Sequence, residues 1–245
     1  MSTLVEGRNA VIEALRGGVP VSAVLLASGS EGGPLDEIRR LATVRDITVR
    51  TVSRRVLDER SVRGAHQGVM AEMAPFAYTS LADVLERVGE RETSLIVVLD
   101  HITDEGNLGA VARSAEVVGA DALVIPKARS AAVGPAAYKT SAGALAHLPV
   151  VREPNLVRML ERLKEAGYWV AGATEAASTL AWDAPLEGRI ALVMGSEGEG
   201  LSRLVEKTCD FTVRLPVAGR VASLNVAQAT AVLAFEWARR TSATR

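Results

Sequence analysis

Short apolar runs alternate with segments of helical spacing throughout the part of the chain that begins at Ser94. The runs lack the polar alternation of a half-exposed strand, which is typical of strands buried on both faces of a parallel sheet. Strands that alternate with helices form βαβ units, so the pattern predicts a doubly wound α/β domain with a mainly parallel sheet. The expected strands cover residues 95–100, 122–126, 148–151, 168–173, 190–194 and 211–215, and the expected helices cover residues 107–119, 154–167, 201–208 and 226–237.

The front of the chain has the pattern of a separate, smaller α/β unit. Pro75 and a polar stretch then flank one short helix, so a linker is expected between this unit and the main domain. The expected division is a small domain at residues 1–74, a linker at 75–93 and the main domain at 94–245. Within the small domain, helices are expected at 7–18, 34–46 and 53–62, and strands at 21–27, 47–52 and 67–73.

The composition excludes several classes of protein. With 245 residues, of which 48% are hydrophobic, the chain can form one large or two small cores. The net charge of −1 gives no overall attraction to nucleic acid or membranes, although a local basic face is compatible with that total. The single cysteine excludes an internal disulfide, and the three histidines lie far apart without cysteine partners, so no metal site is expected. Since neither a signal peptide nor an apolar run of about 18 residues is visible, a soluble, cytoplasmic protein is expected.

Three polar or glycine-rich loops follow expected strands, at residues 101–107, 195–200 and 216–225. Their sequences are HITDEGN, GSEGEG and PVAGRVASLN. In doubly wound sheets, ligands bind beyond the carboxyl ends of the strands. The three loops are therefore expected to converge on one ligand site.

The second of these loops has the position of a nucleotide-binding loop but not the sequence of one. It follows a strand and precedes a helix, yet it matches neither the G-x-G-x-x-G nor the Walker pattern. Glu197 and Glu199 would repel a phosphate, so a neutral or cationic ligand fits better. The alternative is an ordinary, flexible glycine-rich connection.

The polar side chains near the other two loops each allow two interpretations. Asn107, Ser223 and Asn225 are of the types that cap helix N-termini, and capping alone would explain them. Arg113 stands among apolar residues on its expected helix and so needs an anionic partner, which is either Glu116 or an external phosphate. These residue types indicate a ligand site, but they do not name a reaction.

The same loops resemble the motifs of a known family. DHITDEGNLGAVARSAEVVGA resembles the first motif of the SpoU/TrmH branch of the SPOUT RNA methyltransferases, in which an Arg follows an Asn by six residues. LVMGSEGEGLS resembles the second motif, and LPVAGRVASLNVAQAT resembles the third, whose core is Ser-Leu-Asn. VEGRNAVIEALRGG and GAHQGVMA resemble the ends of the small substrate-binding domain of this branch, which is similar to ribosomal protein L30e. Glu105 and Ala227 depart from the common pattern, in which many members have Pro and Ser.

The resemblance implies a fold, a cofactor and a substrate. It implies a catalytic domain with a deep trefoil knot, S-adenosylmethionine (SAM) as cofactor, and a homodimer. Because of the front domain, the nearest match within the branch is the RlmB group, which methylates a guanosine 2′-hydroxyl in the peptidyl-transferase P loop of 23S rRNA. The alternatives are a 2′-O-methyltransferase of tRNA or of another rRNA nucleotide, including antibiotic-resistance types, and a non-catalytic RNA-binding assembly factor.

The resemblance also assigns roles to single positions of this chain. The residues that match its polar catalytic set are Asn107, Arg113, Glu197, Ser223 and Asn225. The residues expected to hold SAM are Gly195, Leu215, Leu224, Thr174 and Glu175. In the front domain, Arg54, Arg55 and Arg63 are expected to contact RNA phosphates, and a solvated helical face is the alternative.

Overall fold

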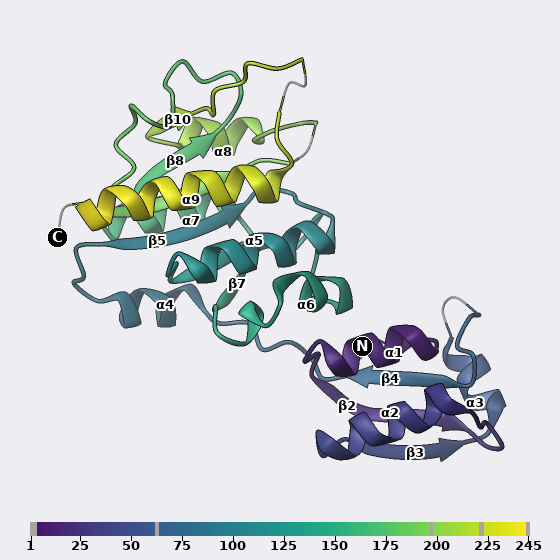
Figure 1. Cartoon of the computed structure of the whole chain (residues 1–245). Coiled ribbons are helices and arrows are strands. Elements are labelled where there is room, and N and C mark those ends of the chain that lie inside the picture. The colour runs from purple at the N-terminus through teal and green to yellow at the C-terminus, as the bar shows by residue number, and fades with distance from the viewer. Residues whose placement is uncertain (1–3, 62–63, 197, 221–222, 244–245) are drawn as a thin grey trace. The chain divides into compact units, whose positions relative to one another are not determined.

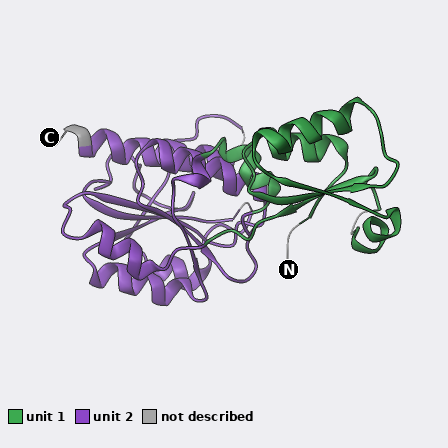
Figure 2. Cartoon of the chain, turned by 90° about the horizontal axis from the view of Figure 1, so that it is seen from below, with its two compact units in different colours: residues 1–77, 134–143 green, residues 78–133, 144–245 purple. Residues whose placement is uncertain are grey.

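The chain folds into two compact units (Figure 1; Figure 2). The structure, a computed structural model, describes residues 4–61, 64–196, 198–220 and 223–243. The first unit contains residues 1–77 and 134–143, and the second unit contains residues 78–133 and 144–245. Segment 134–143 thus folds with the first unit, although it lies within the expected main domain in sequence.

The first unit is built on a mixed sheet of four strands. Its elements are β1 (Leu4–Glu6), α1 (Arg8–Arg16), β2 (Val21–Ala27), α2 (Gly33–Val44), β3 (Thr48–Val52), α3 (Arg54–Arg60), β4 (Val69–Met73) and α6 (Pro135–Ser141). The strand order is β1-β4-β2-β3, in which only β2 and β3 pair in parallel. Leu25, Leu57 and Met70 are buried together in its core. The expected small α/β unit is confirmed, whereas β1 and α6 are not among the expected elements.

The second unit contains a parallel sheet of six strands. Its elements are α4 (Leu81–Val88), β5 (Ser94–Leu99), α5 (Glu105–Val117), β6 (Ala122–Pro126), the 3₁₀ helix η1 (Ala144–Ala146), β7 (Val150–Glu153), α7 (Leu156–Glu165), β8 (Trp169–Ala173), β9 (Arg189–Met194), α8 (Arg203–Thr208), β10 (Phe211–Val213) and α9 (Val226–Ala243). The strand order is β10-β8-β9-β5-β6-β7, and every neighbouring pair is parallel. The predicted parallel α/β domain is confirmed.

Helices cover both faces of the six-stranded sheet. Side chains such as Ile96 and Val124 pack in one core cluster with α4, α7 and α8. The side chains that alternate with them, such as Val97 and Leu123, are also fully buried and point to the opposite face. That face is covered by α5 and α9, which lie side by side (Figure 1). Burial on both faces explains why these strands show no polar alternation in the sequence.

The C-terminal helix α9 is 18 residues long and is anchored to the domain by polar contacts. Its Trp237 donates a hydrogen bond from Nε1 to the carbonyl oxygen of Gly188, at 3.0 Å. Glu236 is only 6% exposed and accepts hydrogen bonds from Arg239 and Arg240, which lower its pKa to about 2. Among the described residues, no helix is both long and apolar enough to cross a membrane.

Candidate active site

Four parallel strands of the second unit end together at one edge of the sheet. Met194 at the end of β9 lies opposite Leu99 of β5 and Ala173 of β8. Ala173 in turn lies opposite Val213 of β10. Because adjacent strands are about 4.8 Å apart, the segments that follow these residues start side by side. The three loops therefore begin at one edge of the sheet, as the sequence predicted.

Gly195, the first residue after β9, makes a close contact that a side chain would prevent. A Cβ atom at this position would lie 2.2 Å from the carbonyl carbon of Gly200 and 2.4 Å from the nitrogen of Leu201. The loop folds back on itself, since the amides of Ser196 and Gly200 each donate to the other residue's carbonyl oxygen at 3.0 Å. The predicted catalytic residue Glu197 lies outside the described residues. The tight backbone turn explains why glycine is needed at position 195.

Asn107 does not cap helix α5, so that interpretation was wrong. The helix begins at Glu105, and its N-cap is Asp104, whose side chain accepts a hydrogen bond from the Asn107 amide at 2.6 Å. The carboxylate of Asp104 accepts a hydrogen bond from a backbone amide of the first turn, and a carboxylate is at least as good an N-cap as the amide of an asparagine. The side chain of Asn107 instead accepts a hydrogen bond at its Oδ1 from Nδ2 of Asn225, at 3.0 Å. This bond joins the first loop to the third.

Asn225 both caps a helix and takes part in the site. Its Oδ1 accepts a hydrogen bond from the amide of Ala227 at 2.9 Å, which satisfies the first turn of α9. Its Nδ2 makes the bond to Asn107. The prediction of capping is thus confirmed for Asn225. Ser223 lies three residues before the start of α9 with an exposed side chain, and it makes no capping bond within the part of the chain that the structure describes.

Arg113 lies on the exposed side of α5, opposite the buried residues Leu108, Val111 and Ala115. The sequence predicted that Arg113 needs an anionic partner because its neighbours are apolar. That expectation is wrong, because the side chain of Arg113 is exposed. Within the described residues, Arg113 and Glu116 form no ion pair. The guanidinium is accessible to an external anion such as a phosphate.

The segment after β8 lies against the end of β10. The Thr174 amide donates to the carbonyl oxygen of Val213 at 3.0 Å, and the Arg214 amide donates to the carbonyl oxygen of Thr179 at 3.0 Å. Leu215 follows immediately and is half-buried, whereas the side chains of Glu175 and Leu224 are exposed. Thr174, Gly195 and Leu215 therefore lie at the ends of three adjacent strands.

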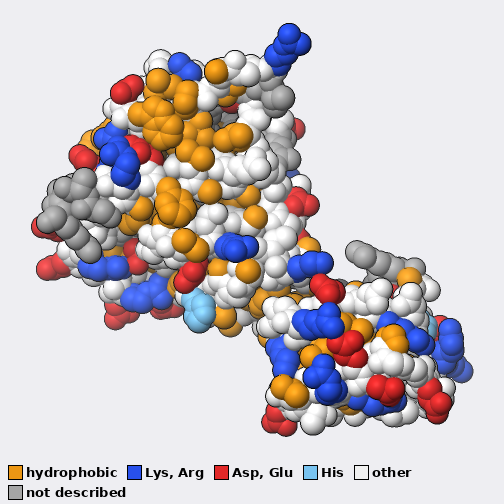
Figure 3. Space-filling model, viewed as in Figure 1, with side chains coloured by type: hydrophobic (Ala, Val, Ile, Leu, Met, Phe, Trp, Pro, Cys, Tyr) orange, Lys and Arg blue, Asp and Glu red, His pale blue; other side chains and the backbone are white. Residues whose placement is uncertain are grey.

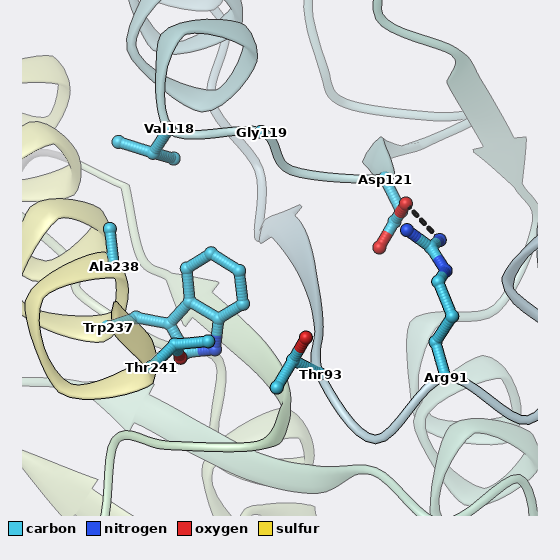
Figure 4. Close-up of a pocket in the computed structure, with 8 residues that line it drawn as sticks. All are labelled: Arg91, Thr93, Val118, Gly119, Asp121, Trp237, Ala238 and Thr241. Atoms are coloured by element: carbon cyan, nitrogen blue, oxygen red, sulfur yellow. Dashed lines mark hydrogen bonds and ion pairs between the residues drawn. The ribbon is translucent and has the colours of Figure 1, made fainter. Parts of the chain in front are cut away.

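The cavity in Figure 4 lies at the opposite edge of the sheet. Its volume is about 220 Å³, and it is lined by Arg91, Thr93, Val118, Gly119, Asp121, Trp237, Ala238 and Thr241. Thr93 precedes β5 and Asp121 precedes β6, so the cavity is near the amino ends of these strands. Ligands of parallel α/β sheets bind at the carboxyl ends. None of the predicted site residues lines this cavity, which is not the site described above.

Comparison with known families decides the class of protein. Residues 4–79 match the family described as RNA 2′-O ribose methyltransferase substrate binding. Residues 94–235, more than half of the chain, match the SpoU rRNA Methylase family. The chain belongs to the SpoU family. The edge that joins Gly195, Asn107 and Asn225 is thus part of an RNA 2′-O-methyltransferase domain.

This SpoU protein is similar over its whole length to curated and solved relatives. It is 39% identical over 235 residues to the "Putative TrmH family tRNA/rRNA methyltransferase YacO" of Bacillus subtilis (strain 168), which covers 96% of this chain and 94% of that protein. The SpoU methyltransferase AviRb from Streptomyces viridochromogenes, in complex with the cofactor AdoMet, is 28% identical with a TM-score of 0.68, covering 98% of this chain and 90% of that one.

Two further solved structures differ in how much of this SpoU chain they match. An AdoMet-bound rRNA methyltransferase from Sinorhizobium meliloti is 25% identical with a TM-score of 0.65, and the match covers 98% of this chain and 87% of that one. A structure that concerns 2-OH methylation of C/U34 on tRNA is 26% identical with a TM-score of 0.55. That match covers 63% of this chain and 99% of the other.

One part of this edge was missed by the sequence analysis. Asp100 and His101 lie directly after β5 and are bonded to each other through Oδ1 and Nδ1. The signal in the sequence was an ionisable residue at the end of a fully apolar strand, where a buried carboxylate needs partners. Of the predicted residues, Arg63 lies outside the described residues, as Glu197 does.

Two substitutions of Asn225 separate its two hydrogen bonds. Asn225→Asp keeps an oxygen for the Ala227 amide but loses the donor to Asn107, whereas Asn225→Ala loses both of these bonds. We expect Asn225→Ala to lower the free energy of unfolding by about 1 kcal/mol and Asn225→Asp to lower it much less. Both variants should lower the turnover of RNA methylation, because Asn107 loses the bond that joins the loops. Urea unfolding and methyl-transfer assays measure the two effects.

Asn155→Ala is the matched control, since it removes the cap of α7, where Asn155 accepts from the Arg158 amide at 3.1 Å. It should cost similar stability without lowering turnover. Wild-type turnover in Asn225→Asp would show that the bond to Asn107 has no catalytic role.

Proposed function

We propose that this SpoU enzyme methylates the ribose 2′-hydroxyl of a guanosine in the peptidyl-transferase P loop of 23S rRNA, with SAM as methyl donor. The presence of the front unit is the observation that supports rRNA as the substrate class. The AdoMet-bound rRNA methyltransferase matches 98% of the chain, whereas the tRNA-directed structure leaves more than a third of it unmatched. The residues outside that shorter match need an explanation, and a substrate-binding domain at residues 4–79 provides one.

The chemistry of the carboxyl edge fits SAM. Thr174, Gly195 and Leu215 would hold it from three adjacent strands, with Leu224 and Glu175 at the rim. Segments 174–181 and 195–201 contain no Lys or Arg, and Glu175 and Glu199 have the charge opposite to that of a sulfonium. When bound, SAM supplies an electrophilic methyl group. On this proposal, the residues after β9 and β10 form the trefoil knot that surrounds the cofactor.

Arg113 is proposed to bind an RNA phosphate and to stabilise the negative charge that develops on the 2′-oxygen. A free guanidinium stays protonated far above neutral pH, so its deprotonation at pH 7 costs about 7 kcal/mol. That cost makes a charged guanidinium a good electrostatic partner and a poor base. Asn107, Glu197, Ser223 and Asn225 complete the proposed catalytic set by orienting the ribose and the loops.

A 2′-O-methyltransferase of tRNA, or of another rRNA nucleotide, is the second candidate. The name of the Bacillus subtilis relative includes both tRNA and rRNA, and that relative matches both units of this chain. The target nucleotide of the present enzyme would then be set by the front unit rather than by the catalytic loops. The loops act on a ribose, which every nucleotide of RNA contains.

Mapping of ribose methylation tests the proposed target. In a strain that lacks the enzyme, we expect one guanosine of 23S rRNA to lose its 2′-O-methyl group, measured by mass spectrometry of total RNA. The wild-type gene should restore the group and Arg113→Ala should not, while SAM affinity measured by calorimetry stays nearly unchanged. A methyl group missing from tRNA would contradict the rRNA assignment. Lost SAM affinity in Arg113→Ala would place this residue in the cofactor site instead.

The basic face of α3 is proposed to contact RNA phosphates. Arg54 and Arg55 both have exposed side chains at the start of this helix. Arg55 pairs with Glu59 at 2.7 Å, but 85% of its side chain stays accessible. Such exposed pairs contribute little to stability, so the guanidinium can exchange its partner for a phosphate. Arg63 is part of the same proposal.

The double variant Arg54→Gln, Arg55→Gln should bind RNA with a weaker salt dependence. Each lost phosphate contact lowers the slope of log K against log salt by about 0.7–0.9, so two lost contacts lower it by about 1.4–1.8. Titrations of 23S rRNA fragments at several salt concentrations measure this slope. Arg39→Gln, Arg40→Gln on α2 removes the same charge and should leave the slope near that of the wild type. Equal slopes for the two double variants would contradict the assignment to α3.

A homodimer through α5 and α9 is proposed as the active form. Val117 on α5 is 61% exposed, and Val232 and Phe235 on α9 are 37% and 52% exposed. Orange side chains gather on the side of the second unit where α9 lies (Figure 3). An exposed apolar patch of this kind is typical of a subunit interface. Moreover, Arg113 follows Asn107 by six positions, which places the two side chains about 120° apart around α5. A second chain would explain how both serve one reaction.

Phe235→Asp should convert the dimer into a monomer, because a charge in an apolar interface is left without a partner. Light scattering coupled to size-exclusion chromatography measures the molar mass. Leu204→Asp is the control, since Leu204 is 67% exposed on α8, on the other face of the sheet. It should leave the mass unchanged. A wild type that runs as a monomer at micromolar concentration would contradict the proposed dimer.

A further inference from the structure

Asp100 is a buried carboxylate outside the proposed catalytic set. It is the first residue after β5, and its exposed fraction is 0%. Its Oδ2 accepts a hydrogen bond from the Ser202 amide at 2.6 Å, and its Oδ1 is bonded to Nδ1 of His101. Burial of a carboxylate costs several kcal/mol unless partners offset it. Among the described residues, His101 is the only ionisable side chain that pairs with Asp100.

His101 is held with one ring nitrogen toward Asp100 and the other available. Its backbone φ is +59°, in the left-handed region that residues other than glycine seldom adopt. An ionised carboxylate only accepts hydrogen bonds, so a neutral ring bonded to ionised Asp100 has its proton on Nδ1 and an unprotonated Nε2. The side chain is 30% exposed, and Nε2 makes no hydrogen bond within the described part of the chain. Its lone pair can therefore accept a proton from a bound molecule.

His101 lies beside the start of the second loop. It belongs to the first loop, which ends at Asn107. The Asp100 amide donates to the carbonyl oxygen of Met194 at 2.8 Å, which places His101 beside the strand end that leads into Gly195. Ser202, the other partner of Asp100, directly follows the segment that packs against Gly195. Asp100 thus ties the first loop to both ends of the second.

We propose that His101 is the base of the methyl transfer and that its Nε2 accepts the proton of the ribose 2′-hydroxyl. The inference rests on the proposed function, because it uses the same cleft. The electron pair of the broken O–H bond allows the 2′-oxygen to bond to the methyl carbon, and the pair of the broken carbon–sulfur bond stays on sulfur, which becomes neutral. The imidazolium keeps its Nδ1–H bond to Asp100, whose negative charge stabilises it.

An imidazole meets a requirement that the guanidinium of Arg113 does not. A neutral imidazole can accept a proton near pH 7 at little cost, because it is the side chain that ordinarily changes charge in this range. Arg113 can then stay charged and stabilise the alkoxide. The two groups perform separate tasks in one reaction.

The charged group in direct contact with His101 is Asp100. Other ionisable groups lie in the segments that border it. The turn into α5 has Asp104 and Glu105, the segment from β9 to α8 has Glu199 and Arg203, and Arg129 precedes Ser130 and Ala131, which both donate to the carbonyl oxygen of Ile102. Within the described residues, only Asp100 of these groups is bonded to the ring, so its replacement should have the largest effect on the ring.

Single-turnover methyl transfer tests the proposal. The assay uses the full-length enzyme, labelled SAM, and total RNA and ribosomal subunits from a strain that lacks the enzyme. We expect His101→Gln to lower the rate by about 10²–10⁴-fold, with SAM affinity unchanged by calorimetry. The wild-type rate should fall at acid pH as the ring becomes protonated, and the variant should lack this fall. His147→Gln, which removes an exposed imidazole that precedes β7, is the matched control and should change neither property.

The tautomer of His101 gives a test that does not depend on activity. Long-range proton–nitrogen NMR of histidine-labelled protein, without SAM or RNA, should show a protonated Nδ1 and an unprotonated Nε2. Asp100→Asn should shift this tautomer and lower the rate. If Asp100→Asn unfolds, His101→Ala replaces it, and added imidazole should restore part of its rate.

Two results would overturn the assignment of His101. One is a rate for His101→Gln within about threefold of the wild type, since a base contributes far more than that. The other is a wild-type ring whose proton lies on Nε2. A wild type that binds SAM but methylates none of these RNAs would contradict the proposed reaction itself. That result differs from an active wild type whose rate does not depend on His101, which would contradict only the role of His101.

Discussion

The register of the parallel strands is the constraint on which this site depends. Met194 lies opposite Leu99 and Ala173, so the backbone turns after three strands begin at one level. A slip of one residue in β9 would invert its buried side chains and move Gly195 away from Gly200 and Leu201. The apolar packing on both faces of the sheet therefore also determines where the catalytic loops start. Stability of the core and geometry of the site are set by the same strands.

The architecture could be predicted because its signals are local. Fully apolar runs such as that of β5 predict buried parallel strands, and apolar residues at helical spacing predict α7. β1 was missed because three residues are too short for a pattern, and α6 was missed because Ala and Gly around it gave no apolar stripe. Segment 134–143 folds with residues that are distant in sequence, and such a contact leaves no periodicity to detect.

The site could be predicted only in part, because its bonds join distant segments. Asn107 and Asn225 are 118 residues apart, and nothing in either loop specifies that their amides meet. The sequence assigned capping to Asn107, but Asp104 stands three residues earlier and performs that task. The acidic cap leaves the Asn107 side chain available for Asn225. A local rule gave the wrong cap here because two capping residue types compete within one turn.

The arrangement of charge at the carboxyl edge follows from what a proton transfer requires. A base must be neutral before the reaction, whereas a group that stabilises an alkoxide must already be charged. A guanidinium satisfies the second requirement at any physiological pH, and Arg113 stands about two turns beyond the start of α5 at Glu105. A guanidinium in contact with the imidazole would oppose its protonation. Asp100 has the opposite effect, because a carboxylate excluded from water attracts the imidazolium strongly. The proposed base is thus paired with the one buried charge among the described residues at this edge, and the same carboxylate holds the Ser202 amide in place.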